Sequence, residues 1–175
     1  RVISVHKANT ANAFSTNEIG VASGNLYSAS TPGGAAFGYQ LDNYRVDVYA
    51  GKATKFGTGS DPMIGKRVGG FDTNAGGLAL YDENKQKVGA IGVSGDTLCA
   101  NHVIAWKIRE RLGNGAYKST NVPFGLSASL NDMLIQDIIQ DTTYGAPGYS
   151  PSTYGHPRCR NNPTVEQAAG SIEFH

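Results

Sequence analysis

The feature that most constrains the fold is a pair of short strand-like runs, rich in small residues, on either side of a polar turn. The first run covers residues 77–81 and the second covers residues 87–93. The five residues between them, 82–86, are Asp-Glu-Asn-Lys-Gln, a composition that does not continue a strand. Two such runs separated by a polar segment predict a β-hairpin.

A helix-like segment follows the hairpin directly and covers Thr97 to Leu112, ending at Gly113. Asp96 stands just before it and is predicted to be the N-cap, because a short carboxylate side chain can accept hydrogen bonds from the free amides of the first turn. Gly113 is a good terminator for the same segment. The predicted apolar stripe of this helix consists of Leu98, Ala105, Ile108 and Leu112.

The remaining elements are weaker. Residues 2–14 have apolar and alanine residues at three- and four-residue spacing and predict a short helix. A second short helix is expected around residues 18–27. Residues 31–70 are rich in glycine and predict a long ordered loop, with one alternating stretch at 44–49. Residues 133–139 predict a late strand or a helical turn.

Size and charge exclude several classes of protein. A chain of 175 residues is long enough for one domain with a core and short for two. The 15 Lys and Arg residues and the 14 Asp and Glu residues are scattered, so the basic patch of a nucleic-acid-binding protein is not present. No apolar run approaches the roughly 20 residues that a membrane span needs.

The two cysteines, Cys99 and Cys159, lie in different settings, one in the helix-like segment and one in a proline-rich tail. An even pair suggests a disulfide, while a reactive thiol or a metal ligand is the alternative for each. We found no second Cys or His at ligand spacing around either residue. A disulfide that closes a loop of this length would contribute roughly 4 kcal/mol and would indicate an oxidising compartment.

The motifs of the chain resemble those of the GlcG/HbpS (haem-binding, DUF336-type) family. The resemblance is carried by residues 7–14, 76–82, 88–96 and 99–106 in that order, and it covers roughly residues 2–30 and 62–113. It implies an α+β fold, a profilin-like antiparallel sheet flanked by helices. The whole chain is then one domain, with a core at 1–30 and 62–140, a loop at 31–61 and a tail at 141–175.

Two further implications come from the tail and from the start of the chain. Gly155-His156-Pro157 followed by Cys159 resembles the longer, exported branch of the family, which implies a Cys99–Cys159 disulfide and a secreted or periplasmic protein. Family members carry a helix and a strand pair before the motif at residues 7–14, and nothing in this sequence corresponds to them. We therefore expect a homo-oligomer, or a separate fragment or partner chain that completes the sheet, because uncovered strand edges are unfavourable.

The ligand-binding residues predicted from the sequence are Lys7, Thr10, Asp96 and His102. Lys7 shares a helical face with apolar residues, so its ammonium either reaches solvent or meets an anionic group such as a haem propionate. His102 is predicted to face the apolar side of its helix, as a buried hydrogen-bonded imidazole or as a ligand or acid/base group. His6 and His156 are further ligand candidates, expected to be exposed.

The resemblance implies a protein that binds haem or handles iron, and no axial ligand is carried over from the family to a residue of this chain. A non-catalytic assembly or partner-binding module is the alternative, since the long loops favour it. A small-molecule enzyme in which Asp96 and His102 transfer protons is the third hypothesis, although no complete catalytic constellation is visible. Gly89 and Gly92, with Ala90, would admit close approach of a helix, a ligand or a second subunit.

Overall fold

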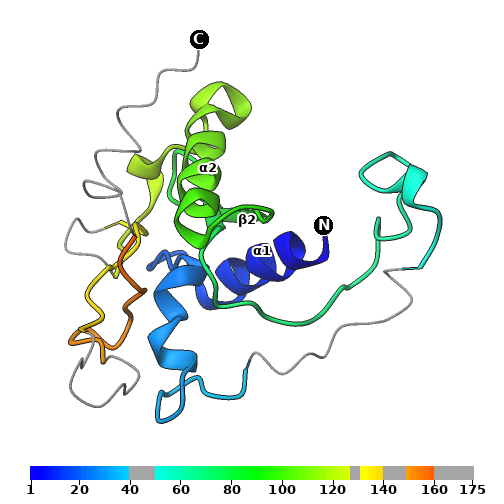
Figure 1. Ribbon diagram of the computed structural model, residues 1–175. Coiled ribbons are helices and arrows are strands. Elements are labelled where there is room, and N and C mark those ends of the chain that lie inside the picture. The colour runs from blue at the N-terminus through cyan, green and yellow to red at the C-terminus, as the bar shows by residue number, and fades with distance from the viewer. Residues whose placement is uncertain (40–49, 127–130, 140–148, 160–175) are drawn as a thin grey trace.

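The computed structural model describes residues 1–39, 50–126, 131–139 and 149–159. It contains both helices and strands, in agreement with the α+β class (Figure 1). The elements, in chain order, are α1 (Val2–Phe14), η1 (Ser23–Leu26), η2 (Ser28–Ser30), η4 (Ala53–Lys55), β1 (Gly77–Tyr81), β2 (Lys87–Gly92), α2 (Leu98–Arg111), η5 (Leu112–Gly115) and η6 (Ser119–Asn121), where η denotes a short 3₁₀ helix.

The predicted hairpin is confirmed. β1 and β2 pair antiparallel, with Leu78 opposite Ile91 and a bulge between Leu80 and Tyr81. The turn is organised by Asp82, whose carboxylate accepts hydrogen bonds from the amides of residues 84 and 86. These two strands form the one sheet found among the described residues, so the described part of the chain does not close a larger sheet.

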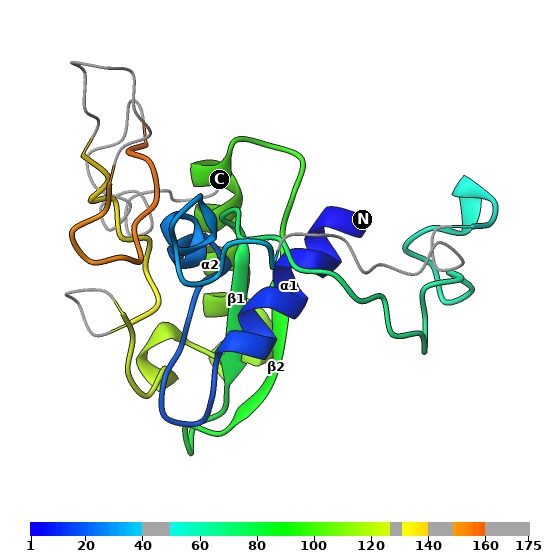
Figure 2. The ribbon, with the colours of Figure 1, turned by 90° about the horizontal axis from the view of Figure 1, so that it is seen from below.

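The hairpin lies between the two long helices (Figure 2). α1 approaches one face so closely that a Cβ atom added to Gly92 would lie 1.8 Å from the carbonyl oxygen of Ser4. On the other face, Leu78 packs against Ala105 and Trp106 of α2 in the main apolar cluster. Small residues on one side and large apolar residues on the other thus set the different distances of the two helices from the sheet.

α1 has the predicted bounds, residues 2–14. Its buried side is formed by His6, Lys7, Thr10 and Ala11, whereas Ile3 is 47% exposed. The buried side of α1 is therefore largely polar. Among the described residues, no helix is long and apolar enough to cross a membrane.

α2 is confirmed, but two details of its prediction were wrong. Its N-cap is Thr97, whose hydroxyl accepts a hydrogen bond from the amide of Ala100, and not Asp96. The predicted apolar stripe was also wrong, because Ile108 and Leu112 are exposed. The buried side of α2 consists instead of Asn101, His102, Val103, Ala105, Trp106, Lys107 and Arg109.

The expected helix at residues 18–27 was also wrong, because only the 3₁₀ turns η1 and η2 form in this region. Within the described part of the chain, residues 133–138 form neither a helix nor a strand, and the side chain of Asn25 holds them by donating to the carbonyl of Met133 and accepting from the amide of Ile135. Ile139 then forms an isolated antiparallel bridge with Tyr149. The alternating stretch predicted at residues 44–49 lies outside the described residues.

Candidate functional site

A groove of about 500 Å³ lies between α1, β2 and the segment that precedes β1. Its walls contain small and apolar residues, and two cationic side chains stand on one side of it. This volume falls in the range of small-molecule sites. The lining residues are Val5, Ala8, Asn9, Asn12, Lys66, Arg67, Val68, Gly69, Gly89 and Ala90.

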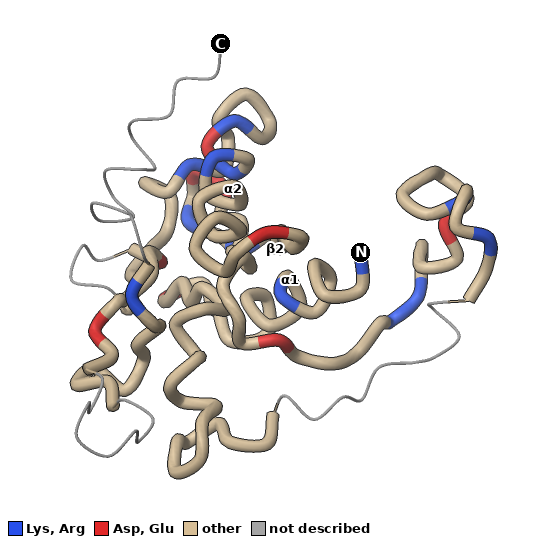
Figure 3. The backbone as a smooth tube through the Cα atoms, viewed as in Figure 1, with Lys and Arg blue, Asp and Glu red and all other residues tan. Residues whose placement is uncertain are grey.

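The charge on one wall distinguishes this groove from a second hollow of about 400 Å³ between residues 28–35 and 149–154, which has no charged residue in its lining. Elsewhere, charges of both signs are dispersed along the described chain (Figure 3). Lys66 and Arg67 are both exposed, so they can meet a ligand without a large desolvation cost. The groove therefore suits a ligand that is apolar over most of its surface and anionic at one end.

The position of the groove wall is fixed by hydrogen bonds to α1. The side chain of Asn9 donates to the carbonyl of Gly70, and the hydroxyl of Thr10 accepts from the amide of Asp72. Gly70 has φ +75°, and a Cβ there would lie 2.9 Å from Nε2 of His6, so only glycine fits over this buried ring. Thr10, which the sequence predicted as a ligand-binding residue, is thus fully buried and holds the wall in place.

Lys7, another predicted site residue, is 2% exposed and does not line the groove. Burial lowers the pKa of its ammonium, and the carboxylate of Asp72 opposes this shift. Lys7 therefore places a positive charge next to the start of β1, and the carboxylate of Asp72 partly compensates it.

Asp96 and His102, the other two predicted residues, lie in different environments. Asp96 is exposed, and its carboxylate accepts a hydrogen bond from the amide of Thr97. His102 is fully buried, as the helical pattern predicted, and burial lowers its pKa to about 3. Neither of its ring nitrogens has a hydrogen bond partner among the described residues, so the expected hydrogen-bonded imidazole is not what the structure has.

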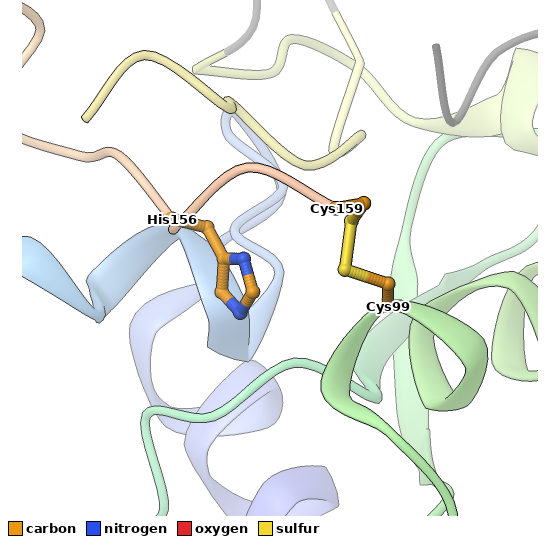
Figure 4. Close-up of side chains that lie close together, drawn as sticks. All are labelled: Cys99, His156 and Cys159. Carbon is orange, nitrogen blue, oxygen red and sulfur yellow. A yellow bond between two sulfur atoms is a disulfide. The ribbon is translucent and has the colours of Figure 1, made fainter. Parts of the chain in front are cut away.

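The tail and the start of α2 meet at a second candidate site. Cys99 and Cys159 form the predicted disulfide, with Cα atoms 5.9 Å apart. His156 lies beside it, and one ring nitrogen of His156 and the two sulfurs all lie within 4.8 Å of one another (Figure 4). This arrangement was not predicted from the sequence, although His156 stands only three residues before Cys159 and that spacing was the available signal.

The expectation that His6 and His156 are exposed was wrong, since they are 3% and 2% exposed. Nδ1 of His156 lies 2.8 Å from the carbonyl of Pro157, and a carbonyl can only accept, so Nδ1 carries the proton and Nε2 carries the lone pair. Nε2 has no partner among the described residues. Burial lowers the pKa of His156, against the effect of the Pro157 hydrogen bond, and the charge of Lys7 lowers it further.

A buried ion pair joins α2 to the segment after residue 130. Arg109 contacts both carboxylate oxygens of Asp132, at 2.5 and 2.8 Å, and both side chains are fully buried. The guanidinium also lies over the ring of Trp106, at 4.5 Å from its centroid. Sequence patterns did not reveal this pair, because its members are 23 residues apart.

The sequence was compared with models of protein families, with curated proteins and with solved structures, and none of them matches it. The GlcG/HbpS resemblance therefore stays a prediction based on motifs. Among the described residues, the groove and the cysteine–histidine cluster are the two candidate ligand sites that the geometry supports.

Proposed function

We propose that this chain is an extracytoplasmic binding protein whose groove between α1, β2 and residues 66–69 takes a flat, largely apolar, anionic ligand. The observation that carries the proposal is the combination, in one groove, of small apolar walls with the cations Lys66 and Arg67. The disulfide supports the proposed extracytoplasmic location, because structural disulfides persist in oxidising environments.

Haem is the ligand that the family resemblance suggests, and the groove matches part of it. The propionates suit Lys66 and Arg67, and the porphyrin plane suits the walls. The groove-lining residues include no His, Cys, Met or Tyr, so they offer no axial ligand for the iron. The fit is therefore to the periphery of a porphyrin and not to its metal.

Because the groove offers no axial ligand, porphyrin binding should be independent of iron. We expect haemin and metal-free protoporphyrin to bind with equal affinity, measured by quenching of the fluorescence of Trp106, the single tryptophan. Arg67→Glu should weaken both about fivefold, or about 1 kcal/mol, the upper end for an exposed ion pair. Lys52→Glu, an exposed cation outside the groove, serves as the control and should change neither.

Two results would count against the proposal. One is a porphyrin affinity that Arg67→Glu and Lys52→Glu lower equally, since this would show nonspecific attraction. The other is haemin binding that depends on iron and is lost in His102→Asn, which would place the ligand near His102 and Lys7 as the sequence analysis expected.

A second candidate function, assembly into an oligomer, is favoured by the edge of the sheet. The outer edge of β1 is covered by side chains, since Arg109 donates to the carbonyl of Ala79 and Asn121 donates to that of Tyr81. No second strand among the described residues pairs with β2, and Val88 is 54% exposed. An open edge of this kind is a template for another strand.

Light scattering across a range of concentrations tests assembly through this edge. We expect a defined oligomer in which Val88→Lys favours the monomer, because a lysine on an edge strand opposes pairing. A protein that is monomeric at every concentration would exclude this candidate.

A further inference from the structure

The disulfide and His156 form a cluster of metal-ligating groups, and a covalent link between two segments would need only the two cysteines. Three groups with affinity for soft metals, two sulfurs and an imidazole, converge within 4.8 Å. They come from two segments far apart in the chain, the first turn of α2 and residues 156–159 (Figure 4). Nε2 of His156 is buried and unpaired among the described residues, so the ring keeps a binding capacity that the fold does not use.

We propose that reduction of the Cys99–Cys159 disulfide converts this cluster into a site for a soft divalent cation such as Zn²⁺, held by the two sulfurs and one ring nitrogen of His156. The fourth position of a tetrahedral site is then left to water or to another small ligand. The proposal is independent of the groove and of any porphyrin.

The chemical step is balanced with an external dithiol as the reductant. Two electrons from the dithiol break the S–S bond, two protons go to the cysteines, and the dithiol becomes a disulfide. Zn²⁺ then binds both sulfurs as thiolates and releases the two protons. Both cysteines are only partly buried, so the sulfurs are accessible to a small dithiol.

The movement that the metal requires is small. With Zn–S distances of about 2.3 Å and tetrahedral angles, the two sulfurs would lie about 3.8 Å apart, and each would lie about 3.5 Å from the imidazole nitrogen. The three ligand atoms already lie within 4.8 Å of one another. The sulfurs therefore have to separate by about 2 Å, within the range of side-chain rotation.

The tail stays in position after reduction because hydrogen bonds hold it independently of the disulfide. The amide of His156 donates to the carbonyl of Ile135, and the amide of Cys159 donates to the side chain of Gln136. Gly155 is bonded through both its carbonyl and its amide to Ser28. The ring of His156 also contacts Tyr27 edge-on. The reduced site is thus largely preformed.

Charge also fits the proposal. Two thiolates and a divalent cation sum to zero, whereas two thiolates alone would be costly beside apolar neighbours such as Val103, which packs against Cys159. Lys7 lies close enough to His156 to act on it electrostatically, and it adds to the positive charge nearby. The site therefore favours a soft cation, which binds the two cysteines as thiolate anions, over a hard cation, which needs carboxylate ligands.

Cobalt(II) tests the site because it substitutes for Zn²⁺ and gives a sulfur-to-metal charge-transfer band. We expect one Co²⁺ per chain after reduction, displaced by Zn²⁺, and no band in the oxidised protein. Cys99→Ser should abolish the band. His156→Ala should weaken Zn²⁺ binding at least about 100-fold, since even the outer partners of a metal ligand are worth about 10–100-fold.

The matched control is His102→Asn, which removes the other buried histidine on this side of α2 and should leave metal binding unchanged. Equal losses in His156→Ala and His102→Asn would overturn the assignment, as would a Co²⁺ band without sulfur character. If the reduced protein unfolds, Zn²⁺ should restore its circular dichroism, and failure to do so would also refute the proposal. Porphyrin binding is measured on the oxidised protein, so the two tests fail separately.

Discussion

The Arg109–Asp132 pair gives the sharpest stability prediction of the structure. Both side chains are fully buried, and the carboxylate receives two hydrogen bonds from the guanidinium. Asp132→Asn keeps the shape of the side chain and removes its charge. The guanidinium cannot lose its proton, so a buried cation is left with only a neutral acceptor, the carbonyl of Ala79 and the ring of Trp106 around it.

The expected cost follows from the burial of both groups. Removing one partner of a buried ion pair destabilises a protein by about 3–5 kcal/mol. With a urea m-value of about 2 kcal/mol per molar, the unfolding midpoint should fall by about 1.5–2.5 M. The assay is urea unfolding at neutral pH, followed by circular dichroism. Circular dichroism is preferred to the fluorescence of Trp106, because the ring of Trp106 contacts Arg109 directly and its signal would change with the pair itself.

Two controls separate the effect of burying the two charges on stability from the effect of the ion pair itself. Asp61→Asn removes the carboxylate of another doubly bonded Arg–Asp pair, the partly exposed Arg1–Asp61, and should have a much smaller effect. The double variant Arg109→Met with Asp132→Leu should recover most of the stability, because neither charge is then buried. A loss below about 1 kcal/mol for Asp132→Asn would refute the reasoning, since it would show that water reaches the pair.

Three further predictions concern the other buried groups. Burial lowers the pKa of His102 to about 3 in the folded chain, so the unfolded chain binds a proton at this residue more readily. The free energy of unfolding should therefore be unaffected by His102 above about pH 6.5 and should fall by about 2 kcal/mol by pH 5. Urea midpoints at pH 7.5 and pH 5 should differ less in His102→Asn than in the unchanged protein. Gly92→Ala should lower the free energy of unfolding by about 3 kcal/mol, because the added Cβ would meet the backbone of α1. Gly89→Ala should leave the stability nearly unchanged, because no atom lies within 4 Å of its added Cβ. Equal shifts in melting temperature for the two variants would contradict this packing. Cys159→Ser should cost about 4 kcal/mol in the same urea assay, and a much smaller loss would mean that the hydrogen bonds of the tail restrain the chain as well as the disulfide does.

The sequence predicted those elements whose stability is local. α1 and both strands were placed almost to the residue, because helix propensity and the pattern of two strand-like runs around a polar turn depend on a few neighbouring residues. Thr97 was missed as the N-cap since Asp96 is also a favourable capping residue one position earlier. At residues 18–27, Gly24 is needed for close packing against Ala75 and Leu134, and the segment forms 3₁₀ turns and not a longer helix.

The buried side of α2 could not be predicted, because hydropathy patterns assume that buried residues are apolar. Arg109 is buried only because Asp132, from a distant segment, neutralises it. The groove was missed for a related reason, since Arg67 and Asn12 meet there only through the tertiary fold. The disulfide was suggested by the even pair of cysteines and implied by the resemblance, whereas the position of His156 beside it depends on how the tail docks.

The disulfide has a consequence for how the protein survives damage. It closes a ring that contains every residue from 100 to 158, more than a third of the described molecule. A protease that cuts once anywhere in this ring leaves both pieces tethered, so the nicked molecule keeps its mass, apart from one added water, until a thiol separates the fragments. Outside a cell, where proteases are abundant and reductants scarce, such a chain can be cut and still remain a single particle.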